Sequence, residues 1–245
     1  MVPLARRSDT QIGHVSPAVL IAPARKAAPA GAAFQPLQRR HAMLVRLTMI
    51  CAGATAATRK GRFPSDEPLE PRSLTLAKAM RGTLRRADRV WTAPALRACQ
   101  TADALSLNAT VDPMLADQNN GRWAGKSFEE VQARQPEEIA AWLTDPNVAP
   151  HGGESVADVA RRTAGLMDRL IAERGHTIAV THASVIRAAI LHVLGAPLAA
   201  SSKIDVEPLS ITDFRSDGRR WVLRACGVTV PKPAKPLGPK GVHGT

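Results

Sequence analysis

The chain has 245 residues, of which 44% are apolar and 22% charged, values typical of a soluble globular protein with one sizeable core. Its formal net charge is +12, but residues 1–42 hold six basic residues against one acidic residue, and residues 228–245 hold three lysines. Most of the excess charge therefore lies in the two ends. Without a zinc-finger spacing or an aromatic RNA-binding motif, it does not indicate specific nucleic-acid binding.

The cysteines and the apolar runs indicate the compartment. Cys51, Cys99 and Cys226 have no CxxC spacing, which is typical of a reducing cytoplasm. The longest apolar stretches have the length of strands and fall short of the ~20 residues that cross a membrane. We therefore expect a cytoplasmic protein without a membrane partner. The sequence leaves open the oligomeric state and whether translation starts at Met1 or Met43.

In chain order, the first segment is rich in alanine, proline and arginine without periodicity and is predicted to be disordered over residues 1–42. The pattern that follows predicts regular elements. They are a buried strand over 44–50, a loop over 59–71, a helix over 74–86 capped by Ser73, a strand over 89–92, and a helix that starts at Pro94 and ends near residue 105.

The second half of the chain continues this alternation. Its predicted elements are an irregular segment over 112–126, two short helices over 128–135 and 137–145 separated by Pro136, a long helix to residue 173 capped by Ser155, a strand over 177–181, a helix over 185–194 ended by Gly195, and a hairpin of 211–214 with 221–226. Residues 228–245 are rich in proline and are predicted to be disordered.

Alternating strands and helices predict a three-layer α/β/α domain over residues 43–227 with a mostly parallel sheet. Ligands of such sheets bind at the carboxyl ends of the strands. The loops after residues 50, 92 and 181 leave those ends. We expect these three loops to converge on one site.

Polar and small residues in these loops suit an anion. Gly53, with Thr55, lets backbone N–H groups approach a bound anion. Arg97 lies in a first helical turn, where a cation is unfavourable unless an anion lies between it and the helix end, and its guanidinium fork matches phosphate. His182 follows a buried strand and can titrate near neutrality. Considered singly, Arg62, Arg97 and His182 could equally be solvated or bonded to local backbone.

Several segments together resemble the histidine phosphatase superfamily, in its phosphoglycerate mutase-like branch. Residues 96–102 resemble the family's L-R-A-x-Q-T-A segment, and Asp117 with residues 121–125 resembles E-x-x-x-G-x-W-E-G. Residues 152–155 read GGES, and residues 180–187 resemble the motif of the second histidine.

The resemblance, over about residues 44–226, implies a phosphoglycerate mutase-like fold whose reaction is phosphoryl transfer or phosphomonoester hydrolysis, without a cofactor. It also implies that Arg97, Arg62 and His182 bind phosphate and that Asp117 donates a proton.

The first motif of the family is altered in this chain. The family's L-V-R-H-G-E-T aligns with residues 49–55, so Cys51 replaces the phosphate-binding arginine and Ala52 replaces the histidine that attacks phosphorus. Alanine has no lone pair, so it cannot form a phosphohistidine. Loss of the arginine also removes charge stabilisation from the transferring phosphoryl group.

Three functions therefore stay open. The first is a catalytically impaired pseudoenzyme that binds a phosphorylated small molecule or a phosphoprotein. The second is an enzyme with altered chemistry, which uses a Cys51 thiolate or a water activated by Asp117 or His182. The third is a non-catalytic interaction scaffold. We expect no metal site, and we expect ligand specificity to lie in the loops 59–71 and 112–126.

Overall fold

The computed structural model describes residues 45–229, so the predicted disordered segments, residues 1–42 and most of 228–245, lie outside the described residues. Within this range six strands form one sheet in the order β3-β2-β4-β1-β5-β6. They are β1 (Val45–Cys51), β2 (Arg89–Thr92), β3 (Thr110–Val111), β4 (Gly175–Thr181), β5 (Ile211–Ser216) and β6 (Trp221–Val228). Strands β1 to β4 pair in parallel, whereas β5 and β6 are antiparallel to their neighbours. The predicted mostly parallel sheet is confirmed.

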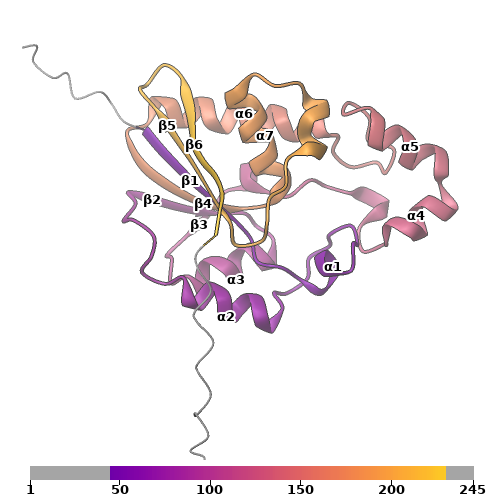
Figure 1. Cartoon of the computed structure of the whole chain (residues 1–245), viewed down its shortest axis with the longest axis horizontal. Coiled ribbons are helices and arrows are strands. Elements are labelled where there is room, and N and C mark those ends of the chain that lie inside the picture. The colour runs from indigo at the N-terminus through magenta and orange to yellow at the C-terminus, as the bar shows by residue number, and fades with distance from the viewer. Residues whose placement is uncertain (1–44, 230–245) are drawn as a thin grey trace, which may run out of the picture. The chain divides into compact units, whose positions relative to one another are not determined.

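Helices cover both faces of this sheet. Figure 1 shows α2 and α3 on one side and α6 and α7 on the other, which confirms the predicted three layers. The helices are α1 (Ala56–Arg59), α2 (Pro71–Ala79), α3 (Leu96–Ala104), α4 (Phe128–Arg134), α5 (Pro136–Thr144), α6 (Val156–Ala172) and α7 (Ala183–Leu194), with 3₁₀ turns at Pro113–Leu115, Gly121–Trp123 and Leu198–Lys203. None of the helices described is both long and apolar enough to cross a membrane.

The central strands form the core because their side chains are apolar on both faces of the sheet. Leu47, Met49 and Ile50 of β1 are fully buried, as are Ile178 and Val180 of β4. Such continuous apolar runs are typical of parallel strands that helices cover on both sides. Burying one side chain of this size contributes about 1.5–3 kcal/mol. This core fixes the positions at which β1 and β4 end.

Three predicted helix boundaries are wrong. Helix α2 starts at Pro71, the first-turn position that suits proline, and not after Ser73. The Ser73 hydroxyl instead accepts a hydrogen bond from the backbone N–H of Ala54. The helix also ends at Ala79, shortly before Gly82 takes a left-handed φ of +74°. Helix α3 starts at Leu96, two residues after Pro94.

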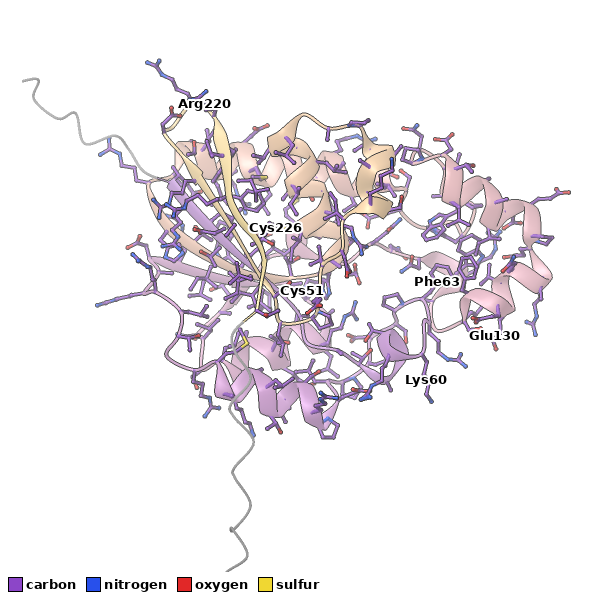
Figure 2. All side chains as sticks on the ribbon, viewed as in Figure 1. Cys51, Lys60, Phe63, Glu130, Arg220 and Cys226 are labelled. Carbon is purple, nitrogen blue, oxygen red and sulfur yellow. The ribbon has the colours of Figure 1, made fainter. Side chains whose placement is uncertain are left out.

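A second apolar cluster lies under α4 and α5, separate from the main core. Its buried members are Phe63, Trp123, Val131 and Ile139, and Trp142 packs against them. The Phe63 and Trp142 rings meet edge to face with centroids 5.6 Å apart, an arrangement that aromatic pairs favour. Figure 2 shows Phe63 on the side of α4 and α5. The cluster holds Trp142 beside the ends of the central strands.

The GGES segment is held by backbone contacts to residues 119–122. The Glu154 N–H donates to the Asn119 carbonyl at 2.8 Å, and the Arg122 N–H donates to the His151 carbonyl at 3.0 Å. A Cβ atom at Gly153 would lie 2.0 Å from the Asn119 carbonyl oxygen. This position therefore needs glycine because two backbone segments approach each other closely.

We expect Gly153→Ala to lower the free energy of unfolding by about 1–3 kcal/mol, since backbone must move to admit the methyl group. Gly165→Ala within helix α6 is the matched control, because outside the helix's own backbone the nearest atom to its Cβ would be the Met114 methyl group, 3.9 Å away. There alanine should stabilise by about 0.5–1 kcal/mol. Urea unfolding of both variants measures the difference. Equal stability of the two variants would contradict the close approach.

Candidate functional site

A cavity of about 440 Å³ lies at the carboxyl ends of the central strands. It brings together five residues singled out from the sequence, which are Cys51, Gly53, Arg97, Asp117 and His182. The other lining residues are Ala52, Thr58, Phe63, Pro64, Gln118, Asn120, Trp142, Ala183, Ser184, Arg187, Val206 and Pro208. The loops after β1 and β4 both reach the cavity, as the strand order β2-β4-β1 requires.

Arg97 forms a buried ion pair with Asp117. The Arg97 side chain is 5% exposed, and its Nη2 donates to Asp117 Oδ2 at 2.5 Å. Its Nη1 donates to the Ser65 carbonyl at 2.9 Å. A buried guanidinium without a counter-charge is strongly unfavourable, so the pair is needed for Arg97 to point into the cavity. The Asp117 carboxylate is therefore the anion that explains why Arg97 lies in the first turn of α3.

Three further hydrogen-bond donors hold Asp117 in place. The Ser184 hydroxyl donates to its Oδ1 at 2.5 Å, and the Gln118 N–H donates to the same oxygen at 2.8 Å. Arg162 of α6 binds the Asp117 backbone carbonyl. Burial opposes ionisation of the carboxyl group, but His182, Arg97 and these donors outweigh it, so the pKa of Asp117 is lowered. Asp117 is therefore an ionised carboxylate at neutral pH.

His182 is the N-cap residue of α7, and only 3% of its side chain is exposed. Its Nδ1 lies 3.8 Å from Asp117 Oδ2. Burial lowers the pKa of His182 to about 4, even though Asp117 acts in the opposite direction. Its buried Nε2 has no hydrogen-bond partner among the described residues. His182 is therefore neutral at neutral pH and has one ring nitrogen that no described residue binds.

The start of α7 adds backbone dipoles to this side of the cavity. The helix runs for 12 residues and has no side-chain cap, and Ala183 and Ser184 of its first turn line the cavity. The N–H groups at a helix start carry a partial positive charge that favours anions. Together with the unpartnered His182 nitrogen, this helix start makes the cavity suitable for an anion.

Cys51 does not have the environment of a reactive thiol. Burial and, to a smaller extent, the Asp117 carboxylate raise the pKa of Cys51 to about 12, and the nearby Arg187 and Arg97 compensate only in part. Removal from water and the Asp117 carboxylate outweigh the neighbouring cations, which argues against the Cys51 thiolate that the sequence leaves open.

Ala52 follows Cys51 at the end of β1 and lines the cavity. Its N–H donates to the Thr181 carbonyl at 2.7 Å, which fixes it next to the end of β4. Its side chain is a methyl group and offers no nucleophilic atom. Of the described residues that line the cavity, His182 is the only histidine.

Three other predicted ligand contacts differ from the expectation. The Gly53 N–H donates to the Thr101 hydroxyl at 3.0 Å and is not available to an anion. Thr55 is buried as the N-cap of α1 and does not line the cavity. Arg62 also lies outside the lining, because its guanidinium binds the Gly125 carbonyl at 3.0 Å and faces Glu130. Glycine at position 53 is explained by packing, since a Cβ would lie 2.9 Å from Leu69.

Arg187 is a cavity residue that the sequence reasoning did not single out. It lies in α7, and its Nε donates to the Ile204 carbonyl at 2.7 Å. A signal was present, because Arg187 follows His182 by five residues on a helix that starts at the site. Periodicity alone does not separate such an arginine from a solvated one. Within residues 45–229 no three His, Cys, Asp or Glu side chains are grouped so that they could hold a metal ion.

Comparisons with known proteins agree with this geometry. The family model described as histidine phosphatase superfamily (branch 1) matches residues 47–229. A bifunctional protein of Mycobacterium tuberculosis is 35% identical over 125 residues, 49% of this chain and 34% of that protein, so the chain spans about a third of that relative's length. Phosphoserine phosphatase 1 of Hydrogenobacter thermophilus is 25% identical over 197 residues, 76% of this chain and 93% of that protein.

Among solved structures, a mycobacterial glucosyl-3-phosphoglycerate phosphatase in complex with VO3 is similar to this chain. It is 28% identical with a TM-score of 0.67. The match covers 76% of this chain and 100% of that chain.

We expect Cys51 to resist alkylation in the native chain, because its thiol is buried and stays protonated. Cys226 on β6 is exposed and is the internal control (Figure 2). Treatment with iodoacetamide at about pH 8 should label Cys226 and leave Cys51 unlabelled until urea is added, as mass spectrometry of peptides measures. Labelling of Cys51 as fast as Cys226 would restore the thiolate hypothesis.

His182 should contribute to acid sensitivity. The unfolded chain binds a proton near the ordinary histidine pKa of 6.5, while folded His182 stays neutral down to about 4. The stability linked to this residue is therefore complete above 6.5 and is lost as the pH falls towards 4. Urea unfolding over this range should show a weaker pH dependence for His182→Gln than for the wild type. The same slope in both proteins would show that His182 is not buried in its neutral form.

Proposed function

The chain belongs to the histidine phosphatase superfamily, and from this premise we propose that it binds a phosphate monoester in the cavity but lacks the family's histidine nucleophile. The observation that carries the proposal is the set of groups around Ala52. A buried arginine, an unpartnered histidine nitrogen and a helix start face one cavity, while position 52 itself offers only a methyl group.

Binding is supported by charge and by size. Arg97 and Arg187 line the cavity with Asp117 as the one acidic lining residue among those described, so the lining carries a net positive charge. A volume of about 440 Å³ lies in the range of small-molecule sites, which favours a small phosphorylated molecule over a phosphoprotein. Two relatives are named as phosphatases of phosphoserine and of a phosphoglycerate ester, which agrees with this ligand class.

Catalysis is impaired in this proposal because the attacking group is absent. Asp117 and His182 can still hold or move protons, and general acid–base help contributes roughly 10²–10⁴-fold. Enzymatic accelerations are typically 10⁶-fold or more. The raised pKa of Cys51 argues against a thiol that replaces the histidine. The unpartnered His182 Nε2 and the net positive charge of the lining argue against a scaffold whose cavity has no ligand.

The test is turnover of an aryl phosphate by the full chain, beside Ala52→His and the double variant Cys51→Arg/Ala52→His. We expect no turnover above background for the wild type. The double variant should gain at least about 10²-fold, the scale of one restored catalytic group. Arg62→Gln in the double-variant background is the matched control, since Arg62 lies outside the cavity and its loss should leave the gained activity unchanged.

Turnover by the wild type would contradict the proposed impairment. Cys51→Ser and Asp117→Ala would then separate a thiol mechanism from water activated by a carboxylate. Binding of inorganic phosphate, measured by calorimetry, tests the other half of the proposal. Asp117→Asn should tighten that binding, because the variant removes the carboxylate that competes for Arg97.

A further inference from the structure

The sheet carries arginines from three adjacent strands on the face that points away from α6. Trp221 of β6 donates its indole N–H to a backbone carbonyl of α6, so the side chains that alternate with it along the strand lie on the opposite face. Val222 and Arg224 are on that opposite face and are exposed. In the register of the sheet, Arg46 of β1 lies opposite Arg215 of β5, which lies opposite Val222 of β6. Arg46, Arg215 and Arg224 therefore share one face.

The carboxylate that lies among these arginines is already engaged. Arg46 donates from Nε to Asp213 Oδ1 at 2.8 Å and from Nη2 to Oδ2 at 3.1 Å. The Thr48 hydroxyl donates to the same Oδ1 at 3.1 Å. Among residues 45–229, no carboxylate forms an ion pair with Arg215 or Arg224. Arg215 is half-buried and directly opposite another arginine, an arrangement that an external anion would stabilise.

The turns at the same end of the sheet add further positive charge. Their exposed arginines are Arg85, Arg86, Arg174, Arg219 and Arg220. The two carboxylates in these turns bind backbone groups. Asp88 accepts a hydrogen bond from the N–H of His176 at 2.7 Å. Asp217 accepts from the N–H groups that follow it in the turn between β5 and β6.

These residues define a basic end of the sheet. Eight arginines face three carboxylates there, a net charge of +5, whereas residues 45–229 as a whole carry only +4. The positive charge of the domain is thus concentrated at this end. Strand β1 also starts here, so residues 1–42, with six basic residues against one acidic residue, are joined to the domain at the basic end.

The basic end is separate from the proposed phosphate site. The cavity lies at the carboxyl ends of β1 and β4, whereas the basic end is formed at the start of these strands. Figure 2 shows Arg220 at one end of the molecule and Lys60 and Glu130 at the other. A ligand of the basic end therefore does not compete with a phosphate in the cavity.

The chemistry of the basic end matches a phosphate backbone. The planar guanidinium fork pairs with phosphate oxygens. Adjacent strands lie ~4.8 Å apart, so arginines on β1, β5 and β6 span ~10 Å, a length along which duplex DNA carries several charges at one per ~1.7 Å.

The exposed apolar residues favour a duplex over a single strand or a membrane. Single strands bind by stacking their bases on aromatic side chains, and membrane-surface helices insert Trp, Phe or Leu side chains. None of the large apolar residues exposed within residues 45–229 is aromatic, and Val222 is the one that lies at the basic end.

We propose that the basic end binds a nucleic-acid duplex through its phosphate backbone, without reading the base sequence. Arg215 and Arg224 supply the contacts on the sheet face, and the arginines of the turns extend them. The inference goes beyond the proposed function and does not depend on it.

The experiment measures the affinity of the full chain for a fluorescent DNA duplex of about 20 base pairs by anisotropy at several salt concentrations. The logarithm of the association constant should fall linearly with the logarithm of the salt concentration, by about 0.9 for each phosphate contacted. Arg215→Gln/Arg224→Gln should weaken binding about tenfold and reduce this slope by about 2. Urea unfolding should show unchanged stability, because neither guanidinium has an ion-pair partner among the described residues.

The matched control is Lys60→Gln/Arg134→Gln, which removes the same charge from exposed positions on α1 and α4. It should change the affinity by less than about twofold, since charges beyond a Debye length of about 8 Å are screened. A second duplex of the same length and unrelated sequence should bind with equal affinity.

Four outcomes would overturn the inference. The first is no duplex binding by the wild type at about 50 mM salt. The second is an equal loss in the two double variants, because binding would then follow net charge alone. The third is unchanged binding in Arg215→Gln/Arg224→Gln, which would assign the duplex to another part of the chain. The fourth is tighter binding to phosphatidylserine vesicles than to the duplex, which would identify a membrane surface as the partner.

Discussion

The buried ion pair between Arg97 and Asp117 is the interaction on which the site depends. A guanidinium as buried as that of Arg97 needs a counter-charge, and Asp117 supplies it at 2.5 Å. Asp117 is in turn tied to α7 through Ser184 and to α6 through Arg162. The pair therefore fastens α3 on one face of the sheet to helices on the other, across the ends of the parallel strands. His182 lies beside this pair, and burial keeps its ring neutral although the Asp117 carboxylate favours the protonated form.

The Arg97–Asp117 pair also determines how charge is distributed over the lining of the cavity. Because Asp117 neutralises Arg97, the net positive charge of the lining comes from Arg187, five residues beyond His182 on α7. In the proposed function an incoming phosphate shares Arg97 with Asp117, whereas no described carboxylate forms an ion pair with Arg187. Binding and chemistry are separable in this proposal, since it assigns binding to the arginines and attack on phosphorus to position 52.

The lining of the cavity comes from more of the chain than the two loops in which the sequence predicts specificity. Loops 59–71 and 112–126 do contribute, through residues such as Phe63 and Gln118. A second cavity of about 240 Å³, which shares Gln118, Trp142 and Arg187 with the first, is formed largely by α5 and by the 3₁₀ turn Leu198–Lys203. Trp142 reaches it because the aromatic cluster with Phe63 and Trp123 anchors α5 there. A packing interaction far from the strands in sequence thus shapes the ligand site.

The sequence by itself determined the layers, the parallel centre of the sheet and the convergence of Arg97 and His182, because apolar periodicity and strand ends are local signals. Asp117 entered only through the family resemblance. The sequence also shows alanine at position 52, and an alanine side chain cannot act as a nucleophile in any fold. Only the tertiary structure decided which groups already have partners. The Gly53 N–H donates to the Thr101 hydroxyl, and the Arg62 guanidinium binds the Gly125 carbonyl. Burial keeps the Cys51 thiol protonated. Arg187 donates to the Ile204 carbonyl and forms no ion pair with a described carboxylate. Pairing and desolvation depend on neighbours distant in the chain, so no local pattern reveals them.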